Sequence, residues 1–174
     1  WQDSADYDIG DVIPFKLEGT VAANYGSYTT YKFTFHDAQS KGLTFNAASV
    51  KAYVDSKEIS TDYYTVSTTP ATETEGEKID ITFSNLKDIA DVQANSVITV
   101  EYTSELNTGA VIGSTGNPNT MHLEYSNNPN TGHEKETGET PDDTVIVFTY
   151  KVVANKINEN EEALKGASFK LEKK

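Results

Sequence analysis

The 174-residue chain contains no cysteine and no arginine. Without cysteine it has neither disulfides nor thiolate metal ligands, so it lacks the covalent crosslink that small extracellular domains commonly use. All 14 positive side chains are lysines, which excludes the bidentate guanidinium contacts of many phosphate-binding sites. The net charge of −13 argues against nucleic-acid binding, because that function needs a basic surface.

No hydrophobic run in the sequence approaches the length of a membrane-spanning segment, and no secretory signal peptide is visible. The length is enough for one medium domain, or for one domain and part of a second. Because the first residue is Trp1, we expect a mature or truncated piece of a longer protein. Tyrosine, threonine, serine, asparagine and valine are plentiful, and this composition favours an extracellular all-β protein.

Short segments of alternating apolar and polar residues recur along the chain, and turn-forming residues separate them. The alternation is clearest in Lys78–Phe83 and again at Ile98, Val100 and Tyr102. One short helical turn is predicted over residues 86–94. The pattern predicts an all-β fold, an immunoglobulin-like two-sheet β-sandwich. Its strands are expected near residues 11–21, 29–37, 49–55, 62–67, 77–84, 96–104, 109–113, 119–126, 144–157 and 167–172.

The composition changes after the predicted sandwich. Residues 127–143 contain no aliphatic or aromatic side chain and have the composition of a linker. A strongly apolar strand follows at 144–157. We therefore expect a first domain over residues 1–128, a linker over 129–143 and the opening strands of a second immunoglobulin-like domain over 144–174. Two strands cannot bury a core alone, so the alternative is that these last strands close the first domain.

Two polar residues fall on the apolar faces of predicted strands. Asp37 continues the apolar face of residues 31–35, and Asn119 shares a face with the apolar positions of residues 121–125. Successive strand side chains point to opposite faces, so both residues are expected to point into a core. A buried carboxyl or carboxamide is costly unless it has a partner. From the residues alone, Asp37 could also open a turn, and Asn119 could be a satisfied core asparagine.

Five short motifs occur in order: Ile9–Val12, Asp37–Phe45, Leu106–Gly113, Gly116–Asn119 and Tyr125–Pro129. In this order and spacing they resemble the central, D2-type domain of sortase-assembled pilus backbone subunits, which are surface proteins of Gram-positive bacteria. The segment from Val147 to Leu171 is similar to the start of the next, B-type domain of such a shaft. The resemblance covers nearly the whole chain.

The resemblance implies a fold like the A-type domain of collagen adhesins and an intramolecular isopeptide bond. In the family, a buried lysine amine attacks the side-chain carboxamide of an asparagine while a protonated aspartate assists. Carried over to this sequence, Asp37 is the assisting acid and Asn119 is the acceptor. The reaction runs once per molecule, so the protein is not an enzyme with turnover, and no metal or other cofactor is implied.

The interior of a sandwich suits this chemistry. An amine attacks only when it is deprotonated, and burial lowers the pKa of a lysine by disfavouring its charged form. Burial raises the pKa of an aspartate, so the acid stays protonated. It can then donate to the amide oxygen and pass a proton to the departing ammonia. The sandwich also holds the partners in contact, which replaces a bimolecular encounter.

The donor lysine is harder to place. In the family it lies on the strand before the Ile-Gly-Asp motif, and residues 1–8 contain no lysine, so we expect the donor upstream of Trp1. Lys16 is the fallback donor, although alternation puts it on the face opposite Phe15. Lys156 continues the apolar face of its strand, and it matches the donor of the following B-type domain. The fallback acceptors are Asn127, Asn128 and Asn155.

Two other groups of residues have side chains of the kind that bind metals. An acidic cluster around Gly10 resembles a calcium loop only loosely, because it lacks the closing bidentate glutamate, and a solvated acidic face is expected instead. The three histidines lack the ligand spacing of a zinc site. No metal is therefore expected. The acidic cluster comprises Asp3, Asp6, Asp8 and Asp11, and the histidines are His36, His122 and His133.

The function implied by the resemblance is that of a major pilin, a structural shaft subunit in an extracellular, cell-wall-anchored pilus. Its partners would be neighbouring pilin subunits in a head-to-tail polymer and the sortase that joins them. The alternative is an adhesin module that binds a host extracellular-matrix protein. A conventional hydrolase is disfavoured, because the sequence has no serine nucleophile elbow. Neither nucleic-acid binding nor membrane insertion is expected.

Overall fold

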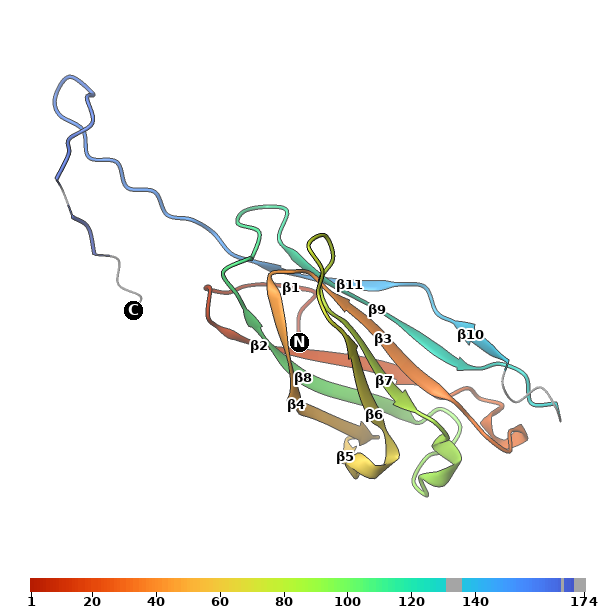
Figure 1. Cartoon of the computed structure of the whole chain (residues 1–174). Helices are drawn as coiled ribbons and strands as arrows, with labels where there is room; N and C mark the ends of the chain where they lie inside the picture. Colours follow the sequence, from red (N-terminus) through yellow and green to blue (C-terminus); the bar gives the residue numbers. More distant parts are fainter. Residues whose placement is uncertain (131–135, 167, 171–174) are drawn as a thin grey trace.

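The computed structural model describes residues 1–130, 136–166 and 168–170, and its strands form two facing sheets (Figure 1). The predicted immunoglobulin-like β-sandwich is therefore confirmed. Within the described residues, no helix is long and apolar enough to cross a membrane. The strands are β1 (Ser4–Asp6), β2 (Val12–Thr20), β3 (Phe33–Gln39), β4 (Leu43–Val54), β5 (Lys57–Glu58), β6 (Thr65–Thr69), β7 (Lys78–Phe83), β8 (Val97–Leu106), β9 (Asn117–Ser126), β10 (Thr137–Glu139) and β11 (Asp143–Phe148).

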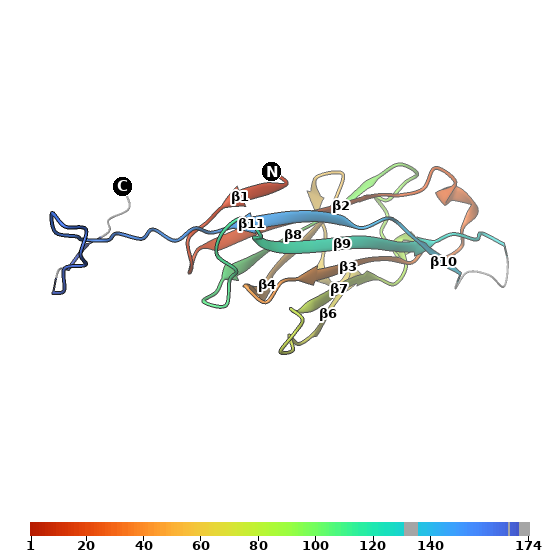
Figure 2. The ribbon, with the colours of Figure 1, turned by 90° about the horizontal axis from the view of Figure 1, so that it is seen from above.

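The first sheet has the strand order β1-β11-β9-β3-β7-β6, and β10 pairs with β9. The second sheet has the order β2-β8-β4-β5. Figure 2 shows β11, β9, β3 and β7 following one another across the first sheet. Strands β3 and β9 are thus interior strands of one sheet, and β8 is an interior strand of the other.

The core lies between the two sheets and follows the alternation of the sequence. On β8, every second side chain is buried, whereas the residues between them reach solvent. Such a period of two is what a strand with one face on a core requires. The buried side chains of β8 are Ile98, Val100, Tyr102, Ser104 and Leu106, so two of the five are polar.

Some predicted strands differ from the observed ones. The strand expected at 49–55 is the second half of the longer β4, which has an irregular register between Asn46 and Lys51. No strand forms at 109–113, because the backbone of Val111 is bound by a side chain rather than by a neighbouring strand. Its N–H donates to Asn117 Oδ1 (2.8 Å) and its carbonyl accepts from Asn117 Nδ2 (3.1 Å). The helical turn is a 3₁₀ turn at Leu86–Asp88.

Strand β11 is part of the sandwich. It pairs antiparallel with β9, where Val145 lies opposite Asn119, and parallel with β1, where Val147 lies opposite Ala5. The Val147 side chain is buried in the core. This differs from the expectation that the strand after residue 143 opens a second domain. The physical reason is that its apolar face is covered by pairing within the first sheet. The segment expected as a linker, 129–143, also contributes β10.

Thr149 is still buried, and its carbonyl accepts from the Gly113 N–H, but beyond it the chain leaves the sandwich and runs away from it (Figure 1). The described residues from 150 onward form no strand, and one isolated bridge joins Ile157 to Ala163. Of the strand expected at 167–172, only residues 168–170 are described, and they have no regular structure. A following domain therefore stays a prediction. Large apolar side chains are exposed in this tail, namely Tyr150, Val152, Val153, Ile157, Leu164 and Phe169.

Two valine substitutions test where the sandwich ends. Val147→Ala is expected to lower the free energy of unfolding by about 2 kcal/mol, because it removes buried methyl groups from β11. Val152→Ala makes the same chemical change at a side chain that is 71% exposed, and should leave stability unchanged. Denaturant unfolding followed by tryptophan fluorescence or circular dichroism measures both. Equal effects of the two changes would contradict the assignment of β11 to the core.

Candidate functional site

Asp37 and Asn119 lie on adjacent strands and point into the core. Strands β3 and β9 are antiparallel, with Asp37 opposite Met121 and Gln39 opposite Asn119. Asp37, Gln39 and Asn119 are each only 3% exposed. The three polar side chains therefore share the inner face of the first sheet, with Asn119 directly across from Gln39 and diagonal to Asp37.

The hydroxyl of Tyr102 reaches this group from the facing sheet. It donates a hydrogen bond to Asp37 Oδ2, and it accepts from Asn119 Nδ2 (2.9 Å) and Gln39 Nε2 (3.1 Å). Two aromatic rings hold the tyrosine ring, with centroid separations of 5.4 Å to Phe15 and 5.2 Å to Phe45. The contact between the sheets is thus polar at its centre and aromatic around it.

Ser104 completes the network on the Gln39 side. Its hydroxyl donates to Gln39 Oε1 at 2.9 Å. Ser104 is two residues from Tyr102 on β8, so alternation places both on the inner face of the second sheet. The network therefore consists of three side chains from the first sheet and two from the second, all of them buried.

Two oxygens of the network have no partner. Among the described residues, the buried side-chain atoms without a hydrogen bond are Asp37 Oδ1, Asn119 Oδ1 and Ser40 Oγ. An unpartnered buried polar atom costs about 1–3 kcal/mol, so it calls for an explanation. The carboxyl and the carboxamide each keep one oxygen available for a further contact, and both belong to the residues that the sequence singled out.

The electrostatics of the site raise the pKa of its acid. Burial raises the pKa of Asp37 to about 6, although the hydrogen bond from Tyr102 and the neighbouring Asn119 amide act in the opposite direction. The pKa of Tyr102 is raised well above its ordinary value of 10, first by burial and then by the nearby Asp37. Asp37 can therefore hold a proton at mildly acidic pH, where an exposed aspartate would be ionised.

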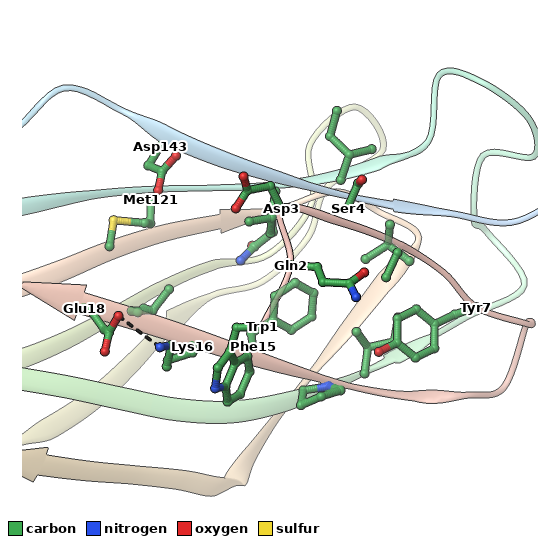
Figure 3. A pocket seen from close by; sticks show the side chains of 18 of the residues that line it. Trp1, Gln2, Asp3, Ser4, Tyr7, Phe15, Lys16, Glu18, Met121 and Asp143 are labelled. Carbon is green, nitrogen blue, oxygen red and sulfur yellow. Dashed lines mark ion pairs between the residues drawn. The ribbon is translucent and has the colours of Figure 1, made fainter. Parts of the chain in front are cut away.

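A cavity of about 1070 Å³ extends from Asn119 to the edge of the sandwich. Its walls come from the N-terminal segment, β2, β9 and β11. Figure 3 shows Trp1 and Gln2 of the N-terminal segment near Phe15 and Lys16 of β2, all of them lining this cavity. Asn119 therefore lies beside a cavity whose other walls include the N-terminal residues.

Lys16 lines the cavity but does not face the network. It is on the side of β2 opposite the buried Phe15, and its Nζ lies 3.0 Å from Glu18 Oε2 (Figure 3) and 5.4 Å from the Trp1 ring centroid. Lys156 lies in the exposed tail. Of the fallback acceptors, Asn127 and Asn155 are exposed, and Asn128 donates to Glu136.

Four buried polar residues near the site were missed in the sequence. Three of them are Tyr102, Gln39 and Ser104, and alternation with neighbouring core residues could have found each of them. The fourth is Asn117, which is fully buried on the same face as Asn119. Its carboxamide oxygen accepts from the Val111 N–H. Its carboxamide nitrogen donates to the Val111 carbonyl and to the Val147 carbonyl (3.2 Å). Asn117 is therefore a satisfied structural asparagine, unlike its neighbour.

No group of three or more metal-ligating side chains is found in the described parts of the chain. In the acidic cluster, the Asp8 backbone N–H donates to Asp11 Oδ2 at 3.0 Å. The rings of His36 and His122 stack on the outer face of the first sheet, with centroids 5.0 Å apart. His36 contacts Asp80 at 2.7 Å. His133 lies outside the described residues.

The chain matches a known protein family over most of the sandwich. A family model described as Gram-positive pilin backbone subunit 2, Cna-B-like domain, matches residues 9–129. The chain belongs to this family. The matched range contains both Asp37 and Asn119, so the candidate site lies inside the pilin domain. Because the description names a Cna-B-like domain, the A-type assignment made from the sequence stays a prediction.

Solved pilin structures show the same fold. The C-terminal fragment of the major pilin GBS80 of Streptococcus agalactiae matches with a TM-score of 0.69 and 25% identity, over 93% of this chain and 57% of that one. The T6 backbone pilin of Streptococcus pyogenes matches with a TM-score of 0.65 and 21% identity, over 90% and 35%. BcpA, the major pilin of Bacillus cereus, gives 0.62 and 16%, over 84% and 37%. No curated protein matches the chain.

The raised pKa of Asp37 predicts how the stability of this pilin domain depends on pH. The native state holds the proton more tightly than the unfolded chain, whose value is 3.8. The stability contributed by the neutral carboxyl is therefore fully present below pH 3.8 and is lost as the pH rises through about 6. The expected loss is about 3 kcal/mol.

The matched variant is Asp37→Asn, which keeps the shape of the side chain and does not titrate there. The difference in unfolding free energy between the wild type and this variant, measured by denaturant titration across that pH range, isolates the carboxyl. The wild type should lose stability relative to the variant as the pH rises. A difference that stays constant with pH would show that the carboxyl has an ordinary pKa.

Proposed function

We propose that this pilin domain is a shaft module stabilised by an intramolecular lysine–asparagine isopeptide bond, with Asn119 as the acceptor and Asp37 as the assisting acid. The observation that carries the proposal is a buried carboxamide with an unpartnered oxygen, held beside an acid of raised pKa and lining a cavity. A structural asparagine would be satisfied by its neighbours, as Asn117 is.

The site offers what amide formation between side chains needs. A lysine amine that enters the cavity would be desolvated, which lowers its pKa and favours the nucleophilic neutral form. The carboxyl of Asp37 would supply a proton as ammonia leaves. Because both reacting groups would be fixed in one sandwich, the step would be effectively unimolecular. The amide product is neutral, so it would remove charges from the interior rather than add them.

The donor is proposed to precede Trp1 and to reach Asn119 through the cavity. Within this chain, the backbone register defines the position on the N-terminal segment that stands level with the acceptor. One residue before the Ser4–Ile146 pair, Asp3 lies level with Val145, which is the partner of Asn119. A lysine on the N-terminal segment would thus be two strand spacings, about 10 Å, from the acceptor. Extended lysine and asparagine side chains together can span that distance.

The bond would take the place of a disulfide in a chain that has no cysteine. By chain entropy, a crosslink that closes a loop of about 100 residues stabilises a domain by about 4–5 kcal/mol. In a shaft under tension, the covalent path would matter more than this figure, because it would transmit force without relying on hydrogen bonds between strands.

The subunit would act in a polymer of pilin subunits on the outside of a Gram-positive cell. The family match supports this role. We further propose that a sortase joins the subunits, that the pilus is anchored to the cell wall, and that Lys156 serves as donor in a following domain. An adhesin function is not favoured, because the structures similar to this chain are described as backbone or major pilins.

Lysine substitutions on the N-terminal segment test the proposal in this chain. Gln2 and Asp3 both line the cavity together with Asn119. The unchanged chain is expected to show its unmodified intact mass. Asp3→Lys or Gln2→Lys should lose the mass of one ammonia, because an amine then enters the cavity. Peptide mapping should join the new lysine to Asn119.

Two controls accompany this measurement. Adding Asn119→Ala to the reacting variant should abolish the loss of ammonia, and adding Asp37→Ala should slow it by at least about 100-fold. If ammonia is lost from the unchanged chain, the donor is already present, and Lys16 replaces the upstream lysine. If neither lysine variant nor the unchanged chain loses ammonia, the isopeptide proposal is wrong.

A further inference from the structure

The hydroxyl of Tyr102 stands between the acid and the nitrogen that would leave. It is bonded to Asp37 Oδ2 on one side and to Asn119 Nδ2 on the other. Tyr102 comes from the facing sheet and is only 2% exposed, so bulk water does not reach its hydroxyl. A protein group that contacts both the carboxyl and the nitrogen can carry a proton between them in this interior.

The direction of each hydrogen bond in the network is fixed by its neighbours. Ser104 donates to Gln39 Oε1, so the Gln39 amide presents its nitrogen to Tyr102. Gln39 and Asn119 each donate to the tyrosine oxygen and together occupy both of its lone pairs. The hydroxyl proton must therefore point to Asp37. In the resting site the Asn119 nitrogen faces the hydroxyl, and its oxygen is left unpartnered.

We propose that Tyr102 is a third catalytic residue of the isopeptide reaction, relaying the proton of Asp37 to the departing nitrogen of Asn119. This inference rests on the proposed function. Gln39 and Ser104 are positioning residues, because they act only by holding the tyrosine hydroxyl. The geometry assigns the relay to Tyr102 because its oxygen is within hydrogen-bond distance of both the carboxyl and the leaving nitrogen.

The reaction forms one amide bond, releases one ammonia and needs no co-reactant. The neutral lysine amine forms a bond to Cγ of Asn119, and the π electrons move to Oδ1. Nδ2 then has a free lone pair, so it accepts a hydrogen bond instead of donating one, and the Tyr102 hydroxyl turns its proton from Asp37 Oδ2 to Nδ2. Nδ2 takes this proton, while the protonated Asp37 gives its own proton to the tyrosine oxygen. The Cγ–Nδ2 bond breaks with its electron pair on nitrogen, and ammonia leaves as the C=O bond reforms. The Asp37 carboxylate takes the surplus proton from the lysine nitrogen, which restores both catalytic residues.

The test is Tyr102→Phe in the lysine variant that loses ammonia. Phenylalanine keeps the ring contacts with Phe15 and Phe45 and removes only the hydroxyl. The rate of ammonia loss, followed by intact mass, should fall by about 100-fold, the scale of a lost proton transfer. The matched control is Tyr31→Phe, which removes a hydroxyl from another buried tyrosine (1% exposed) outside the network. Its rate should equal that of the parent variant.

A pH profile separates the relay from a merely structural role. The Tyr102 hydrogen bond lowers the pKa of Asp37, so its removal should raise that pKa further. The pH at which the reaction slows through ionisation of Asp37 should therefore move upward in Tyr102→Phe and stay in place in Tyr31→Phe. Titration of the Asp37 carboxyl by NMR in the unreacted chain should show the same upward shift in Tyr102→Phe.

The outcomes distinguish this inference from the proposed function. A lysine variant that loses ammonia equally fast with and without the Tyr102 hydroxyl overturns the relay and leaves the isopeptide site standing. A slower reaction with an unmoved pH profile also overturns it, since packing alone would then explain the loss. If no lysine variant reacts at all, the proposed function and the relay fail together.

Discussion

The structure depends on one polar contact in the middle of an apolar sandwich, the hydroxyl of Tyr102 meeting Asp37, Gln39 and Asn119. Aromatic packing brings the sheets together. The Tyr102 hydroxyl then provides the hydrogen bonds from the second sheet to the buried polar side chains of the first. An unpartnered polar atom in such a place costs free energy. The network leaves one oxygen of the carboxyl and one of the carboxamide in that state, and the proposed isopeptide chemistry would use both residues.

The proposed shaft role sets a mechanical requirement on a chain that has no disulfides to meet it. It has no cysteine, and it belongs to a family of pilus backbone subunits. Hydrogen bonds between strands break one after another under load, whereas an amide between side chains does not. Burial of Asp37 raises its pKa to about 6, so the ionised carboxyl lowers the stability of the domain above that pH. The same burial would keep the acid protonated for the proposed reaction at lower pH.

Alternation alone places most of the candidate site. Because strand side chains change faces at every residue, the sequence predicts that Asp37 and Asn119 point inward, and the same reasoning extends to Tyr102 and Ser104 on β8. The sequence does not supply the register between β3 and β9 or the pairing of the two sheets. Those depend on contacts between residues far apart in the chain, such as Tyr102 and Asp37. The hydrogen-bond network therefore could not be predicted, although its members could.

The sequence by itself determined the sandwich class, the inward faces of its strands and the resemblance to pilins, because these follow from a local period of two and from short motifs. The tertiary structure decided where the sandwich ends. The apolar alternation of β11 fits either the last strand of one domain or the first strand of the next, and only its pairing with β9 and β1 resolves this. It also decided which asparagine is satisfied. Asn117 and Asn119 look alike in sequence, but Val111 reaches only the first of them.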